Sequence, residues 1–112
     1  MRLADKKIGN LTASEIFFFK LFLDSVVFTI DFSQSRCIAL VAATAQTVLI
    51  IKKNGVQVGT ITFAAAGTVG VFGGAPADVT CVAGDYLTIE GPAVPDVTLA
   101  DIAATLFGER FL

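Results

Sequence analysis

The sequence contains no histidine, the residue that most often serves as a general base or a metal ligand. Neither a Ser-His-Asp nor a Cys-His nucleophile system can therefore be built. Asp85, Asp96 and Asp101 carry carboxylates that could bind calcium, but they lack the dense alternation of a dedicated calcium loop. A Gly-Asp turn at Asp85 and a cap after Pro95 at Asp96 are simpler interpretations. We expect no catalytic residues, no bound metal and no cofactor, and hence not an enzyme.

The two cysteines, Cys37 and Cys81, have neither CxxC spacing nor histidine partners, so a zinc site is not expected. They could form one disulfide in a secreted protein, whereas two buried thiols fit a reducing cytoplasm, which we favour. The N-terminal stretch MRLADKKIGNLTASE is charged and polar, unlike a signal peptide. Residues 54–77 carry no charge, but six glycines make them better suited to short strands than to a membrane-spanning helix.

Two pairs of residues could contact a ligand. Lys52 and Lys53 could touch an anionic partner, although a solvated turn is the simpler interpretation. Tyr86 and Phe72 could line a sugar-binding surface, although a place in the core is favoured, because glycan sites need exposed aromatic rings with polar neighbours. The net charge of −2 gives no basic footprint, so we expect no nucleic-acid partner.

The composition is more apolar than a small domain needs. Hydrophobic side chains make up 54% of the 112 residues and charged side chains only 16%. A domain of this size hides only about two-thirds of the surface of its unfolded chain. We therefore expect copies of the chain to assemble, burying the surplus apolar surface between subunits.

Short apolar runs separated by Gly, Pro and Asn predict an all-β fold: a single antiparallel β-sandwich, jelly-roll-like, of about eight strands. Residues 1–14 are polar and lack a clear period, so they are expected to form an N-terminal arm, and residues 15–112 the sandwich domain. The spacing of apolar residues in 99–107 fits a helix or a closing strand equally well. The predicted strands are residues 16–23, 26–32, 37–42, 47–53, 56–63, 67–72, 79–82 and 86–90.

Asn54 and Gly55 predict a two-residue type I′ hairpin turn, since both tolerate positive φ. A regular register would place Ile51 opposite Val58, and both faces of the hairpin would then be apolar. The hairpin would lie between two layers or be covered by another subunit, and we favour the second arrangement. Four phenylalanines in residues 17–22 likewise exceed what one strand face needs. The expected subunit contact therefore comprises Leu49, Ile51, Val56, Val58, Phe17 and Phe19.

Four stretches of the chain, in this order and spacing, resemble a module found in structural proteins of tailed bacteriophages and prophages. They are ASEIFFFKLFLDSVVF (13–28), IIKKNGVQVGTITFAA (50–65), VAGDYLTIEGP (82–92) and PAVPDVTLADIAATLFGER (92–110). The module resembles a β-sandwich unit and is found near tail-fibre, tail-tip or capsid-accessory genes. The resemblance implies no catalytic residues, and it implies a turn at 98–101 followed by a strand. The module's outer hairpin face is commonly more polar than Leu49 and Ile51 would make it here, which indicates a subunit contact.

The resemblance and the apolar surplus together predict a non-enzymatic structural component of a tailed-phage virion. We expect a symmetric homo-oligomer, most simply a trimer, on the particle exterior as a capsid decoration or a tail or fibre protein. Its partners would be other capsid or tail proteins, which the arm could reach, and it would be made in the bacterial host cytoplasm. The alternative is a glycan- or receptor-binding module of a phage fibre.

Overall fold

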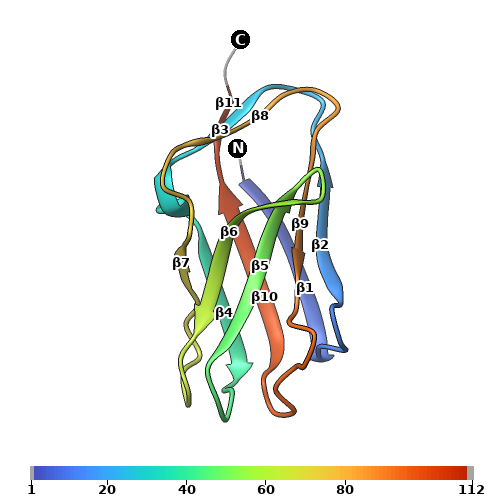
Figure 1. Cartoon of the computed structure of the whole chain (residues 1–112), viewed down its shortest axis with the longest axis vertical. Coiled ribbons are helices and arrows are strands. Elements are labelled where there is room, and N and C mark those ends of the chain that lie inside the picture. Colours follow the sequence, from blue (N-terminus) through green and yellow to red (C-terminus); the bar gives the residue numbers. More distant parts are fainter. Residues whose placement is uncertain (1, 111–112) are drawn as a thin grey trace.

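The computed structural model describes residues 2–110, an elongated body of 43 × 21 × 20 Å built from strands (Figure 1). These residues form eleven strands and one 3₁₀ turn, and every strand pairing is antiparallel. The prediction of an all-β, antiparallel fold is confirmed, with three sheets and more strands than the eight expected.

The largest sheet has five strands and lies in front in Figure 1. The hairpin of β5 (Thr47–Lys53) and β6 (Val56–Phe63) occupies its middle, and β2 (Ile16–Leu21) forms one edge. Apolar and β-branched residues dominate these strands, as a sheet with one buried face requires. In spatial order the strands are β2 (Ile16–Leu21), β9 (Tyr86–Glu90), β5 (Thr47–Lys53), β6 (Val56–Phe63) and β7 (Val71–Gly73).

The second sheet lies behind the first in Figure 1. Its order is β1 (Arg2–Asn10), β10 (Ala100–Phe107) and β4 (Arg36–Val41). A single bridge between Ile38 and Val69 attaches the segment before β7 to the free edge of β4. Residues 99–107, which fitted a helix or a strand, thus contain the central strand β10 of this sheet.

A third, small sheet closes the upper end of the body in Figure 1. It is formed by β11 (Glu109–Arg110), β3 (Val26–Phe28) and β8 (Val79–Cys81). The predicted strand 26–32 is therefore too long, because a 3₁₀ turn, Ile30–Phe32, follows β3. The alternation continues in the sequence, but Asp31 and Phe32 both adopt positive φ. Asp31 and Ala75 exchange two hydrogen bonds of 3.0 Å, and the turn places Phe32 in the core.

The segment expected to form an arm, residues 1–14, contains β1, which pairs with β10 along its length. Leu3 points inward and packs against the core, and two further inward side chains of β1, Asp5 and Lys7, are charged and ion-paired. Lys7 lies 2.8 Å from Glu15, and Asp5 lies 3.7 Å from Lys20. The polar composition that suggested an arm therefore belongs to an edge strand with ion-paired side chains.

The core is one hydrophobic cluster with contributions from all three sheets. Phe22, Phe28 and Phe32 pack in succession, with ring centroids 6.0 and 5.4 Å apart. The large side chains that are fully buried are Phe18, Phe28, Phe32, Phe63, Leu49, Ile51, Ile61, Leu87, Ile89, Leu99, Ile102 and Leu106.

The hairpin has the predicted two-residue turn but not the predicted register. Lys53 pairs with Val56 as expected, but Ile51 pairs with Gly59 rather than with Val58. The extra residue is a β-bulge, and a shift of one residue reverses the faces of two strands relative to each other. Leu49 therefore lies opposite Ile61, so the large apolar side chains share one buried face.

Candidate functional site

Leu49 and Ile51 do not lie on the surface, and their assignment to a subunit contact is wrong. Both side chains are fully buried in the core of the single chain. The bulge directs them to the same face as Ile61 and Phe63, while Thr60 and Thr62 alternate onto the other face. A subunit contact must therefore use other residues.

The remaining members of the expected contact are divided by the structure. Phe17 is buried, and Val58 is half-buried and packs against the core. Phe19 and Val56 are both exposed, but they lie on separate parts of the five-stranded sheet, on the edge strand β2 and at the start of β6. The six residues do not form one surface.

The outer face of the β1-β10-β4 sheet is apolar, and no layer formed by residues 2–110 covers it. Leu40, Ile8 and Ile38 are exposed to 74%, 71% and 47%. They line a shallow groove with Ala103, because β10 presents small side chains between bulkier ones on the two flanking strands. We define the β10 face as Ala4, Ile8, Ile38, Leu40, Ala103 and Thr105.

The charges around the β10 face are mostly positive. Arg2, Lys6 and Arg36 alternate onto this side of the sheet and are exposed. Among residues 2–110, these three are the cations without a carboxylate within 4.0 Å, whereas the other five are ion-paired. Asp101 on this side of the sheet is half-buried, and its Oδ1 accepts the Gly9 N–H at 2.7 Å. Asp5 lines the adjoining groove beside Ala4 and Thr105.

A second apolar area lies on the outer side of strand β2. Ile16, Phe19 and Leu21 are exposed to 52%, 60% and 61%, and we call them the β2 strip. The Phe19 ring stacks on Tyr86 of the neighbouring strand, with centroids 5.5 Å apart. Tyr86 is therefore a partly exposed surface residue rather than part of the core, while Phe72 packs against the core and contacts Phe32.

Asp96 is fully occupied as a hydrogen-bond acceptor. Its Oδ1 accepts the backbone N–H and the hydroxyl of Thr98, at 2.8 and 2.7 Å, and the N–H of Leu99. Its Oδ2 accepts the N–H and the hydroxyl of Thr44 and the N–H of Ala45. These bonds, from Thr98 first and then Thr44, hold the pKa of Asp96 well below its usual range. The carboxylate fastens two loops together and offers no free oxygen to a cation.

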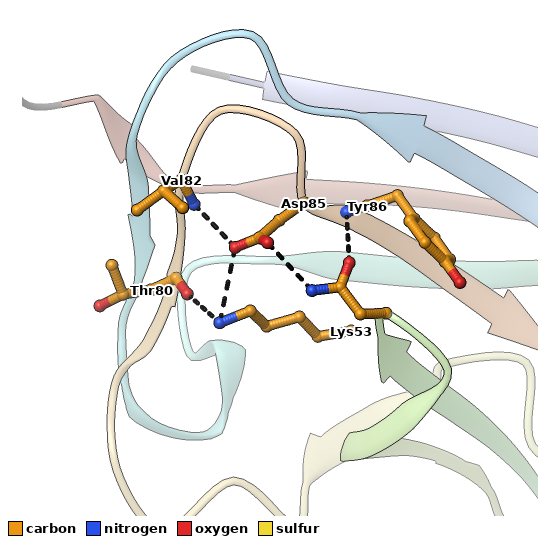
Figure 2. Close-up of polar contacts among 6 residues, drawn as sticks. Lys53, Thr80, Val82, Asp85 and Tyr86 are labelled. Carbon is orange, nitrogen blue, oxygen red and sulfur yellow. Dashed lines mark hydrogen bonds and ion pairs between the residues drawn. The ribbon is translucent and has the colours of Figure 1, made fainter.

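Asp85 has a similar role in the turn between β8 and β9 (Figure 2). Its carboxylate accepts the Val82 N–H and the Asn54 side-chain amide, each at 2.9 Å, and lies 3.6 Å from the Lys53 ammonium. Hydrogen bonds from Val82 and Asn54 lower the pKa of this carboxyl. Lys53 also donates a hydrogen bond to the Thr80 carbonyl, so its side chain links β5 to β8 and is not a free cation.

The hairpin turn adopts the predicted conformation, with positive φ at Asn54 and Gly55. Sequence reasoning missed that the Asn54 side chain also receives the Tyr86 N–H at 3.0 Å, since that contact spans 32 residues. Lys52, next to Lys53 in the sequence, forms an ion pair with Glu90.

Cys37 and Cys81 are free thiols buried in the core. Burial raises the pKa of Cys37 to about 12 and that of Cys81 to about 11. Within residues 2–110 no group of three or more Cys, Asp or Glu side chains has a metal-binding arrangement. No helix in this part of the chain has the length and apolar character needed to cross a membrane.

Comparison of the chain with protein-family models, with curated proteins and with solved structures found no match. The two apolar surfaces therefore remain the candidate site on structural grounds. Sequence reasoning missed the β10 face because it assigned Ile8 to a polar arm and predicted residues 37–42 as a strand without assigning it an exposed face. The alternation of buried Cys37 and Ala39 with exposed Ile38 and Leu40 is visible only once β4 has a single covered face.

Proposed function

We propose that this chain is a non-enzymatic structural subunit of a tailed-phage virion, built as a jelly-roll-like β-sandwich and assembled into a symmetric homo-oligomer. The observation that carries the proposal is the β10 face, a sheet surface whose largest apolar side chains are exposed in the single chain. Such patches mark contacts with other macromolecules. The virion part of the proposal is based on the resemblance of the chain's motifs to phage structural modules.

The strand order supports the jelly-roll description. The chain passes between the two larger sheets from β1 to β2, from β4 to β5 and from β9 to β10. The cluster of buried residues includes side chains of both sheets, such as Ile61 and Ile102, as expected for two packed layers. Jelly rolls recur in viral capsid and lectin domains.

The solution mass of the full chain at micromolar concentration tests the assembly. We expect a discrete oligomer, most simply a trimer, with decoration, tail or fibre copies then locatable in an image reconstruction of the particle. A strictly monomeric chain over the whole accessible concentration range would overturn the assembly. A chain that is absent from purified particles would overturn the virion role.

A second candidate, a glycan- or receptor-binding module, is favoured by one observation. Phe19 is an exposed aromatic ring stacked on Tyr86, and the polar side chains of Lys52 and Glu90 belong to neighbouring strands. A glycan array with the native chain and with Phe19→Ala separates the two functions. Binding that the substitution abolishes would establish the second candidate, and silence of the native chain favours the structural role.

A further inference from the structure

We infer that Asn54, in the turn of the β5-β6 hairpin, is a deamidation site controlled by the fold. Its side-chain amide is protected while the turn is closed and is converted to a carboxylate when the turn opens. Gly55 follows it and has no side chain to hinder attack by its backbone nitrogen on the neighbouring amide. Both residues are exposed, and a Cβ at Gly55 would meet nothing within 4 Å, so water and base reach this peptide bond.

The reaction needs only water as a co-reactant. The Gly55 amide gives up its proton to base, and its nitrogen bonds to Cγ of Asn54, closing a cyclic imide. The Cγ–Nδ2 bond breaks, and Nδ2 leaves as ammonia after it takes up a proton from water. Water then opens the imide at either carbonyl, which leaves an aspartate or an isoaspartate. Because loss of the amide proton comes first, the rate rises with pH.

The closed turn holds the Asn54 side chain away from this reaction. Its Oδ1 accepts the Tyr86 N–H at 3.0 Å, and its Nδ2 donates to the Asp85 carboxylate at 2.9 Å (Figure 2). Both polar atoms of the amide are thus bound at the start of β9. The Asn54 N–H also donates to the Tyr86 carbonyl at 3.0 Å, which fixes the backbone of the turn with a φ of +51°. The amide can turn towards the Gly55 nitrogen only when these bonds break.

Deamidation of the folded chain therefore proceeds through molecules in which the turn has opened. Its rate is the rate in the unfolded chain multiplied by the fraction of time for which the turn is open. Each hydrogen bond lowers that fraction several-fold, and a bond to a carboxylate lowers it more. We expect Asn54 to react roughly tenfold to a hundredfold more slowly in the folded chain than in the unfolded chain.

The product closes the turn less well than Asn54 does. An aspartate has an oxygen in place of Nδ2, so it cannot donate to Asp85, and two carboxylates then face each other. The Lys53 ammonium, 3.6 Å from Asp85, offsets part of this repulsion. Isoaspartate adds a methylene group to the main chain of a two-residue turn whose length is set by the pairing of Lys53 with Val56. Deamidation thus weakens the link between the hairpin and β9 irreversibly.

Peptide mass spectrometry of the full chain after incubation at mildly alkaline pH measures the conversion of Asn54. The same incubation in guanidinium chloride gives the rate in the unfolded chain. Asn10 is an internal control, because the bulky Leu11 follows it and hinders attack by the backbone nitrogen. Asp85→Ala removes the acceptor of Nδ2, whereas Asp85→Asn keeps an oxygen that accepts hydrogen bonds and is the matched control. Circular dichroism shows whether both variants fold.

We expect conversion at Asn54 and not at Asn10, and a rate that rises with pH and on unfolding. Folded Asp85→Ala should react roughly tenfold faster than Asp85→Asn. If Asp85→Ala does not fold, guanidinium chloride below the unfolding transition should accelerate the reaction of the native chain, because it also opens the turn. Asn54→Asp, which carries the aspartate product, should have a lower Tm than the native chain.

Three results would overturn the inference. A rate in the folded chain equal to or above that in the unfolded chain, or equal rates in the two folded Asp85 variants, would show that the closed turn does not protect the amide. Absence of conversion at Asn54 in the unfolded chain would remove the site itself. An unchanged Tm for Asn54→Asp would show that the product does not weaken the turn. None of these results bears on the proposed assembly, which the solution mass tests separately.

Discussion

Oδ2 of Asp96 accepts hydrogen bonds from the backbone N–H and the hydroxyl of Thr44, at 3.0 and 2.7 Å, across 52 residues of sequence. The other oxygen is held by Thr98, whose hydroxyl bonds to Asp96 and contacts the Ala42 carbonyl. A single carboxylate thereby joins the loop after β4 to the loop before β10. These are the two strands that pair in the centre and at one edge of the sheet bearing the β10 face.

The fold should lose stability in acid because Asp96 must be ionised to accept these bonds. Its pKa is depressed in the folded chain, so its contribution is fully present above the unfolded value of about 3.9 and disappears as the pH falls towards the folded value. Asp96→Asn should lower the Tm at neutral pH and flatten the decline in Tm below about pH 4. Thermal unfolding followed by circular dichroism measures both, and parallel Tm curves for the two proteins would contradict the assignment.

Leu49 and Ile51 should stabilise the single chain and not the oligomer. Ile51→Ala removes a fully buried side chain and should cost about 2–5 kcal/mol of unfolding free energy. Leu40→Ala, on the exposed β10 face, should change the stability of the monomer by less than about 0.5 kcal/mol. Denaturant unfolding at concentrations below assembly measures both, and a small cost for Ile51→Ala would show that the core is not closed around it.

The conformation of Asn54 provides a third test. Its φ is +51°, and its side chain bonds to Asp85 and Tyr86. Asn54→Ala should destabilise the fold by about 1–2 kcal/mol from backbone strain alone, because a Cβ with no local hydrogen bonding disfavours the left-handed region. Asn54→Gly removes the same side-chain bonds without that strain and is the matched control. Equal stability of the two variants would assign the whole effect to the lost hydrogen bonds.

Strands and turns that depend on local sequence could be predicted, whereas contacts that depend on tertiary structure could not. Asn54-Gly55 and the run 86–90 carry their own turn and strand preferences. The bulge at Val58 has no signal in the sequence pattern. It shifts the pairing by one residue, which reverses the faces of β5 and β6 relative to each other. The excess of apolar residues could be predicted from the composition, but its location on the surface could not. Which face of β4 is covered depends on how the sheets are arranged.

The N-terminal segment illustrates the same limit. Polar side chains of β1 look like those of a solvated arm until Lys7 is placed beside Glu15 and Asp5 beside Lys20. Lys7 and Glu15 are near in sequence, but the pairing of β1 with β10 joins residues about a hundred positions apart. No local pattern encodes such a contact. The candidate surface could therefore be located only from the fold, since Ile8 and Leu40 meet through β10.

The close approach at Gly70 gives a prediction with a built-in control. A Cβ at this position would lie 2.5 Å from Ile61 Cγ2 and 3.2 Å from the Cys37 Cβ, inside a packed core. Gly70→Ala should therefore cost about 1–3 kcal/mol through overpacking. Gly73→Ala meets nothing within 4 Å and should be close to neutral. Comparison of the urea midpoints of the two variants measures the difference in stability. Equal midpoints would mean that the segment before β7 shifts to accommodate the added methyl group without loss of stability.

Both thiols should be inert in the folded chain. Burial raises the pKa of Cys37 to about 12 and of Cys81 to about 11, so the reactive thiolate is scarce at mildly alkaline pH. Labelling with a disulfide reagent should be slower than that of a free thiol by about a hundredfold or more, and unfolding in denaturant should release both.

The same shift makes the fold sensitive to alkali. The thiol contributions to stability are complete below the unfolded pKa of about 8.5 and are lost as the pH rises towards the folded values. Cys81→Ala should remove its share of that alkaline decline while leaving one slowly labelled thiol. Rapid labelling of the native chain would show that at least one cysteine is accessible, contrary to the burial of both.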